Sequence, residues 1–234
     1  AALCFKLVAM KSFLPKSAAF CALVLLSSAL WADTRTSQEV QIGGQAKPAQ
    51  IQDSGFISQE VELNSNPKVE LTTSKGVIVI ELFPDKAPVT VKNFLAYVES
   101  GYYGNTVFHR VIQNQLIQGG AYTPALQLKA DNGYIRSEAD NGLSNKRGTI
   151  AAARRGNDSE SAGSQFFINV VDNPQFDFSS TATMSMRGYA VFGQVIKGQD
   201  IVDAIRLVPV KPVDKLGGHV PKTPIIISQA RVLD

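Results

Sequence analysis

The residue types that most often act as nucleophiles or metal ligands are scarce in this chain. Its 234 residues include two cysteines and two histidines. Both cysteines, Cys4 and Cys21, lie within the first 32 residues, so the sequence after them contains no thiol. Residues 33–234 therefore lack a disulfide framework, a cysteine nucleophile and thiolate metal ligands. With only His109 and His219, a multi-histidine metal site is excluded, and no Gly-x-Ser-x-Gly motif of serine hydrolases is present.

Arg110 is the residue best placed to supply a fixed charge. It lies in a run of alternating residues, Val107–Ile112, that predicts a strand able to hold the side chain rigidly. A guanidinium is permanently charged and fork-shaped, which suits directed hydrogen bonding better than a lysine ammonium does. The alternative is a surface arginine in a salt bridge. Gln165 and Phe167 lie two residues apart in a second predicted strand, so both project to the same face of its sheet.

Short strands and two helices are expected to position these residues. Alternation around Val69 and Leu71, a tight turn at 74–76 and a return strand over Val77–Phe83 predict a hairpin. The other predicted strands are Val107–Ile112, Thr149–Ala152, Gln165–Val170, Val191–Val195 and Pro224–Val232.

An apolar stripe at helical spacing predicts a helix that follows Pro84-Asp85 and ends at Gly101. A second helix is predicted over Gln199–Leu207, with Ile201, Ala204 and Ile205 on one face. Many short strands with two widely spaced helices indicate an antiparallel barrel capped by helices.

The formal charge of +3 comes from the N-terminal stretch. Residues 1–32 contain three of the 23 basic residues and no acidic one, so 20 basic and 20 acidic residues balance in the remainder. A strongly basic nucleic-acid-binding protein is therefore disfavoured.

Residues 1–32 have the pattern of a secretory signal peptide. Read from Met10, a possible true start, basic residues precede a short apolar run, and small residues follow it. The run is shorter than the ~20 apolar residues that span a bilayer; a buried helix of the mature domain is the alternative. Cleavage after Ala29 or after Ala32 fits the pattern, and a bacterial periplasm is the expected destination.

Residues 33–66 are rich in Gln, Ser, Gly and Pro and are interpreted as a polar linker or tail.

Four ordered segments resemble the signature of the cyclophilins, which are prolyl cis-trans isomerases. They are 108–112 (FHRVI), 118–120 (QGG), 163–168 (GSQFFI) and 191–193 (VFG). Segments 138–143 (EADNGL) and 147–151 (RGTIA) are similar to the periplasmic bacterial branch in particular. The resemblance implies a mainly β fold over residues 67–234, a closed eight-stranded antiparallel barrel capped by two α-helices, with no metal or cofactor.

The chemistry of this family requires neither a nucleophile nor a metal. Rotation about an X–Pro bond breaks amide resonance, with a barrier of ~18–20 kcal/mol. A catalyst must bind the twisted amide better than either planar isomer. The resemblance assigns the catalytic role to Arg110, beside the proline nitrogen. It assigns substrate binding to Gln165, Phe167, Gln118, Leu116, Gln115, Phe176, Tyr189 and Arg154, the last through its backbone.

The chain departs from the family pattern at the expected proline pocket. Gln115 stands where the family has a phenylalanine wall, and Leu116 replaces a methionine of similar volume. Phe176 is a candidate to compensate for the lost wall. Tyr189 replaces a common histidine, and the tryptophan that favours cyclosporin is absent, so weak cyclosporin binding is expected.

Two functions are consistent with the sequence. The first is a periplasmic prolyl isomerase that accelerates X–Pro rotation while exported proteins fold. The second, which Gln115 favours, is a chaperone module that binds proline-containing segments with little or no turnover. In either case the expected partners are proline-containing polypeptides, with no nucleic acid, no stable membrane insertion after signal removal and a monomeric state.

Overall fold

The structure, a computed structural model, describes residues 66–233. The predicted signal peptide therefore lies outside the described residues, as does the predicted linker except for its last residue. Within the described part of the chain, no helix is both long and apolar enough to span a membrane.

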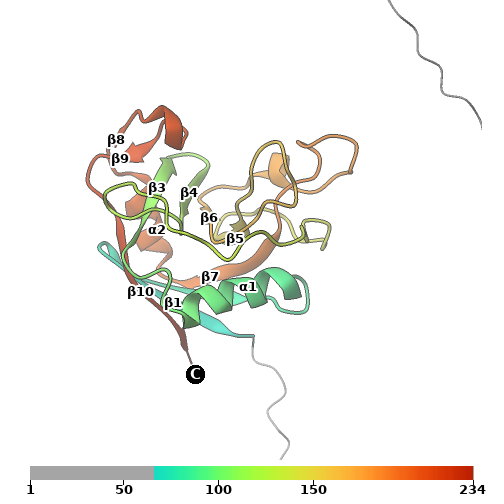
Figure 1. Ribbon diagram of the computed structural model, residues 1–234, viewed down its shortest axis with the longest axis horizontal. Coiled ribbons are helices and arrows are strands. Elements are labelled where there is room, and N and C mark those ends of the chain that lie inside the picture. Colours follow the sequence, from blue (N-terminus) through green and yellow to red (C-terminus); the bar gives the residue numbers. More distant parts are fainter. Residues whose placement is uncertain (1–65, 234) are drawn as a thin grey trace, which may run out of the picture. The chain divides into compact units, whose positions relative to one another are not determined.

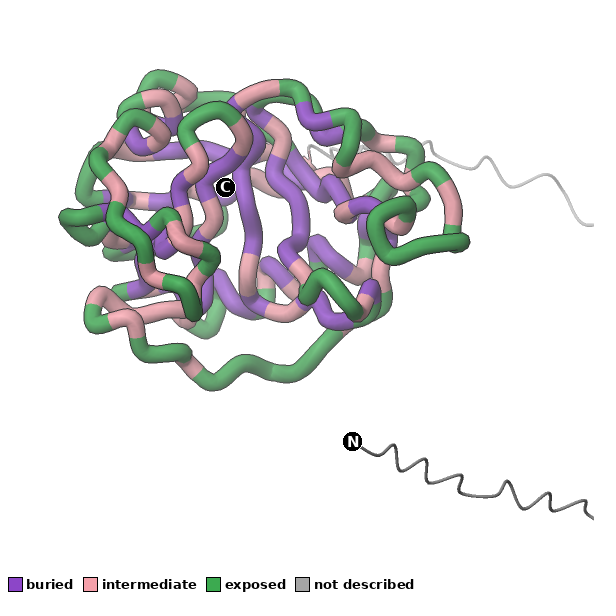
Figure 2. Tube along the Cα trace, turned by 90° about the horizontal axis from the view of Figure 1, so that it is seen from above, coloured by how far each residue is buried: buried purple, intermediate pink, exposed green. Residues whose placement is uncertain are grey.

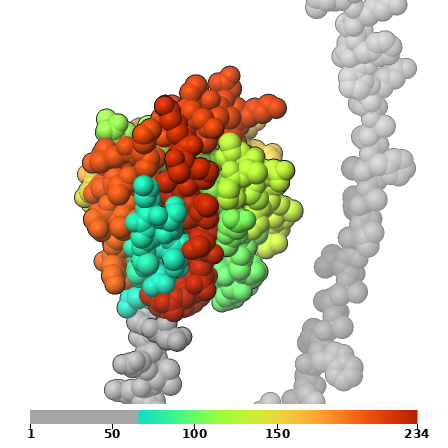
Figure 3. All heavy atoms as spheres, turned by 90° about the vertical axis from the view of Figure 1, so that its left-hand side faces the viewer, coloured from blue at the N-terminus to red at the C-terminus, as the bar shows by residue number. Residues whose placement is uncertain are grey.

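Eight strands form a closed antiparallel barrel, as predicted (Figure 1). Their order around the barrel is β1-β10-β3-β4-β6-β5-β7-β2, so strands from the two ends of the domain lie side by side (Figure 3). The strands are β1 (Lys68–Thr73), β2 (Gly76–Leu82), β3 (Thr106–Ile112), β4 (Leu116–Gly119), β5 (Thr149–Ala152), β6 (Phe166–Asn169), β7 (Val191–Lys197) and β10 (Ile226–Leu233).

Two helices complete the core. Helix α1 (Pro88–Glu99) buries the predicted stripe, and the ring of Phe94 lies 5.2–5.7 Å from the rings of Tyr103, Phe166 and Phe192. Helix α2 (Gln199–Arg206) buries Val202 and Ile205. The predicted face of this helix was wrong in part, because Ala204 is exposed and Val202 takes the inward position. Figure 2 shows the buried strands at the centre, surrounded by exposed loops.

Several short elements were not predicted. Strand β4 has only four residues and ends in glycine, so it is too short to show an alternating pattern. A separate two-stranded sheet pairs β8 (Val210–Lys211) with β9 (Val220–Pro221), and 3₁₀ turns occur at Pro174–Phe176 and Asp214–Leu216. These elements depend on tertiary contacts rather than on hydrophobic periodicity.

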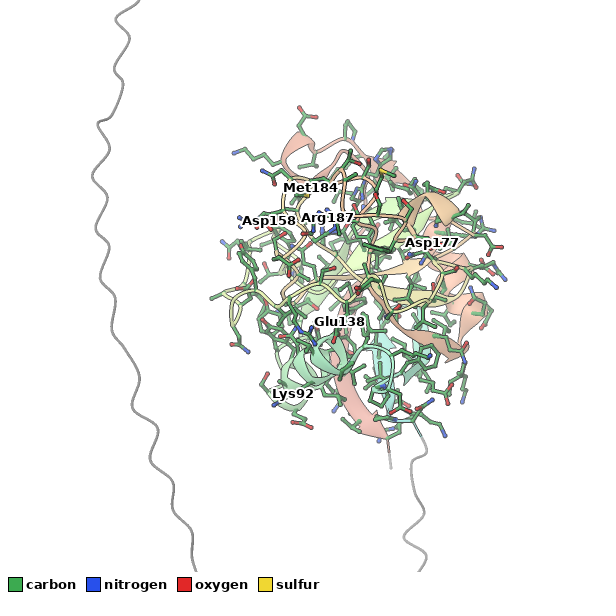
Figure 4. All side chains as sticks on the ribbon, turned by 90° about the vertical axis from the view of Figure 1, so that its right-hand side faces the viewer. Lys92, Glu138, Asp158, Asp177, Met184 and Arg187 are labelled. Atoms are coloured by element: carbon green, nitrogen blue, oxygen red, sulfur yellow. The ribbon has the colours of Figure 1, made fainter. Side chains whose placement is uncertain are left out.

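The start of helix α1 is capped by a distant carboxylate. Ala87 at the cap position has no side-chain acceptor, and Pro88 has no N–H. Glu138, which is 6 % exposed, accepts hydrogen bonds from the backbone N–H groups of Val89 (3.1 Å) and Thr90 (2.8 Å). In Figure 4, Glu138 lies beside the helix that carries Lys92. A buried negative charge at this helix end satisfies backbone donors and complements the helix dipole. The loop before β5 is thereby tied to the helix.

Candidate functional site

Arg110 projects from β3 opposite Gln118 of β4. Its Nη1 donates a hydrogen bond to Oε1 of Gln118 at 3.3 Å, and Nε2 of Gln118 donates to Oε1 of Gln165 at 3.0 Å. Arg110 and Gln165 are therefore linked through Gln118, which orients the guanidinium directly.

The guanidinium of Arg110 is only partly accessible to water. Burial lowers its pKa from the ordinary value, while the nearby Tyr189 acts in the opposite direction. Because an arginine pKa lies far above neutrality, the group keeps its positive charge at neutral pH. A charge with reduced hydration interacts more strongly with a neighbouring electron pair than one in bulk water does.

A hollow of about 190 Å³ opens in front of Arg110. Every residue that the sequence analysis assigned to the site lines it, except Gln165. The lining residues are Arg110, Gln115, Leu116, Gln118, Ala153, Arg154, Phe167, Phe176 and Tyr189. A positive donor therefore faces a partly open space whose lining combines aromatic and aliphatic side chains with the polar side chains of Gln115, Gln118 and Arg154.

Three aromatic rings form the apolar part of this hollow. Phe167, Phe176 and Tyr189 meet edge to face, with ring centroids 5.2–5.8 Å apart. Together with Leu116 they belong to an apolar cluster that is separate from the main barrel core. Phe176 thus occupies the position that a compensating wall would need. Phe167 is itself buried (2 % exposed), so Phe176 and Tyr189, which are half-buried, present most of the ring surface that a ligand can reach.

Gln115 lies in the turn between β3 and β4, and buried asparagines fix that turn. The carbonyl of Gln115 accepts hydrogen bonds from the N–H of Val170 (3.1 Å) and from Nδ2 of Asn173 (2.9 Å). Asn145, 1 % exposed, likewise donates to the carbonyl of Phe176 at 3.0 Å. The sequence analysis missed these two asparagines, because nothing in their spacing shows that they hold the pocket walls.

The side chain of Arg154 fastens a long loop to the rim. Its Nε donates to the carbonyl of Gly188 at 2.9 Å and its Nη2 to that of Met184 at 2.8 Å. Its guanidinium also lies 4.6 Å from the ring centroid of Tyr189. The resemblance implied a role for the Arg154 backbone only, so this side-chain role is an addition. Met184 and Arg187 of the same loop are labelled in Figure 4.

A second hollow of about 270 Å³ adjoins the first and contains Gln165. The two share Gln118, Ala153 and Arg154. The second hollow also includes residues that the sequence analysis did not single out, namely Tyr122, Leu128, Asp131, Tyr134, Arg155, Ser161, Gly163 and Ser164. The two hollows, which together we call the groove, therefore adjoin at Gln118, Ala153 and Arg154.

His109 points away from this groove. It is 3 % exposed and packs against Tyr122, with ring centroids 4.6 Å apart. Burial, together with the charge of Arg110, lowers its pKa to about 4. We assign His109 a structural role, because its imidazole is buried and neutral and lines neither hollow.

Comparison with known proteins places the chain in one family. The model of the cyclophilin-type peptidyl-prolyl cis-trans isomerases matches residues 68–232. A peptidyl-prolyl cis-trans isomerase of Streptomyces antibioticus is 52 % identical over 170 residues, covering 70 % of this chain and 98 % of the relative. Isomerase B of Escherichia coli K12 is 48 % identical over 166 residues, with the same two coverages.

The fold agrees with solved structures of the family. A cyclophilin of Cryptosporidium parvum superposes with a TM-score of 0.62 at 30 % identity, covering 73 % of this chain and 99 % of the other. A structure of that protein in the presence of the dipeptide Ala-Pro gives a TM-score of 0.60, covering 71 % and 99 %.

We predict that His109 makes folding stability depend on pH. In the unfolded chain a histidine has a pKa of about 6.5, against about 4 in the folded protein. The contribution is therefore fully present above pH 6.5 and is lost as the pH falls through 4, up to ~3 kcal/mol in total. An NMR titration of the His109 ring should show a midpoint near pH 4, with His219→Ala used to assign the two imidazole signals. A midpoint near 6.5 would contradict the burial argument.

Proposed function

Since the chain belongs to the cyclophilin-type peptidyl-prolyl cis-trans isomerase family, we propose that Arg110 is the group with which it accelerates rotation about X–Pro bonds. The observation that carries this proposal is the position of one oriented guanidinium at the edge of a hollow that has an aromatic wall. Phe167, Phe176 and Tyr189 supply the surface against which a pyrrolidine ring would pack.

The mechanism depends on the lone pair that the proline nitrogen acquires when the amide twists. Planar X–Pro bonds delocalise the nitrogen lone pair into the carbonyl, and twisting localises it on a pyramidal nitrogen. A cationic N–H donor beside that nitrogen stabilises the twisted form and has little to bind in either planar form. The aromatic hollow anchors the proline ring while the preceding carbonyl rotates. Gln165 and the Arg154 backbone would bind the peptide in the adjoining part of the groove.

Replacing Arg110 tests the proposal. Arg110→Ala should slow the cis-trans exchange of an Ala-Pro peptide by ~10²–10³-fold, the usual cost of removing a donor aimed at a transition state. Exchange spectroscopy by NMR measures this rate on the full chain. Peptide affinity should change by only a few fold. The matched control is Arg136→Ala, which removes an exposed arginine whose nearest carboxylate oxygen, on Glu138, is 3.7 Å away. Equal rates for Arg110→Ala and wild type would refute the mechanism.

A binding module with little turnover is the second candidate, and Gln115 is the observation that favours it. A glutamine side chain in the wall gives a proline ring less apolar contact than a phenylalanine would. The two candidates differ in refolding assays. An isomerase accelerates proline-limited refolding at catalytic amounts, whereas a binding module suppresses aggregation only near stoichiometric amounts.

Gln115→Phe is predicted to raise turnover. The added ring supplies apolar contact worth ~1.5–3 kcal/mol when fully buried, so a gain in kcat/KM of about tenfold, and at most ~10²-fold, is expected. Leu116→Met, which conserves volume at the neighbouring position, is the control and should change kcat/KM by less than twofold. If the Phe variant leaves turnover unchanged, Phe176 already supplies the wall.

We also propose that the chain works on exported proteins in a bacterial periplasm. Support comes from the basic, apolar and small-residue pattern of residues 10–32 and from the absence of cysteine after it. The test is fractionation of a Gram-negative host that expresses the full chain. A shortened periplasmic product is expected, with its N-terminus after Ala29 or Ala32. Leu25→Arg should retain the precursor and Gln45→Arg should not; an unprocessed cytosolic product of the unaltered chain would contradict export.

A further inference from the structure

The segment between β8 and β9, residues 212–219, reaches the rear of the Arg110 side chain. It contains the 3₁₀ turn Asp214–Leu216 and then two glycines with positive φ, Gly217 (77°) and Gly218 (83°). The backbone N–H of Val111 on β3 donates to the carbonyl of His219 at 2.8 Å, which pins the segment to the strand that carries Arg110. In Figure 1 the β8–β9 sheet lies next to the end of β3.

Within this segment, Gly217 is the residue that lies against the side chain of Arg110. A β-carbon placed on it would lie 2.8 Å from Nε of Arg110 and 3.1 Å from Cδ. Real β-carbons essentially never come within 3.0 Å of another heavy atom, so only glycine fits unless Arg110 moves. Nε of Arg110 is buried and has no hydrogen-bond partner within the described residues. The guanidinium is therefore oriented by Gln118 at its tip and confined by backbone at its base.

We propose that Gly217 is a positioning residue for Arg110. Gly217 does not line the hollow in front of the guanidinium, so it acts only through the arginine. A confined base limits the rotamers of a long side chain, and catalysis by a fixed donor is sensitive to displacements of about 1 Å. The inference rests on the proposed function, because it assumes that Arg110 is the catalytic donor.

The neighbouring glycine offers a matched control. Gly218 has nearly the same backbone conformation, and a β-carbon on it would meet nothing within 4 Å. Alanine carries a similar backbone strain at either position. Only Gly217→Ala, however, brings a methyl group against Arg110. A difference in activity between the two variants is therefore due to the contact with Arg110 and not to backbone strain in the turn.

The test compares both variants in the full chain. Gly217→Ala should lower kcat by at least tenfold with KM changed less than threefold, and Gly218→Ala should stay within about threefold of wild type at a similar Tm. The ¹⁵N signal of Arg110 Nε should shift in Gly217→Ala and not in Gly218→Ala. Adding Gly217→Ala to Arg110→Ala should cause no further loss. Equal losses in both glycine variants, or an additive loss in the double variant, would overturn the inference.

Two outcomes separate this inference from the proposed function. If Arg110→Ala keeps wild-type turnover, the proposed function fails. If Arg110→Ala loses turnover while Gly217→Ala does not, the function stands and only the positioning role fails. If Gly217→Ala does not fold, a measurement on the wild-type chain still tests the positioning role. A nuclear Overhauser contact between Hα of Gly217 and Hδ of Arg110 is required, and its absence would overturn the inference.

Discussion

The site depends on keeping one charged side chain partly out of water and in a fixed direction. Withdrawing a guanidinium from solvent is unfavourable, and the lowered pKa of Arg110 expresses that cost. The hydrogen bond that Arg110 donates to Gln118 on the neighbouring strand offsets part of this cost, and the backbone at Gly217, packed behind the side chain, limits its direction. The result is a donor whose orientation is set before any ligand arrives, which is the arrangement that favours a transition state over a ground state.

The residues that fill the barrel and stabilise the fold are not the residues that line the hollow. The barrel interior is filled by the large cluster that includes the helix stripe, whereas the aromatic rings of the hollow belong to a second, smaller cluster outside it. A substitution at Gln115 would therefore leave the core filled. The turn at Gln115 is held through backbone carbonyls, by Asn173 among others, so the side chain carries little of the structure.

Much of this architecture could be predicted from local patterns. Alternating runs and helical stripes predicted most of the strands, both helices and an antiparallel barrel, and the family resemblance added the number of strands and most of the site residues. The pairing of β1 with β10, which lie about 150 residues apart in the chain, has no local signal. The same limit explains what was missed at the site. The link from Arg110 to Gln165 passes through Gln118, and Gly217 reaches Arg110 from a distant loop, because both contacts are set by tertiary packing.

The central claim is that the fixed positive charge, rather than the shape of the side chain, stabilises the twisted amide. Replacing Arg110 by citrulline removes the charge at nearly constant shape, and the rate of Ala-Pro exchange can then be compared with peptide affinity in one NMR titration. The account predicts that exchange slows by ~10²-fold while affinity stays within a few fold. A citrulline protein that turns over as fast as the arginine protein would contradict it.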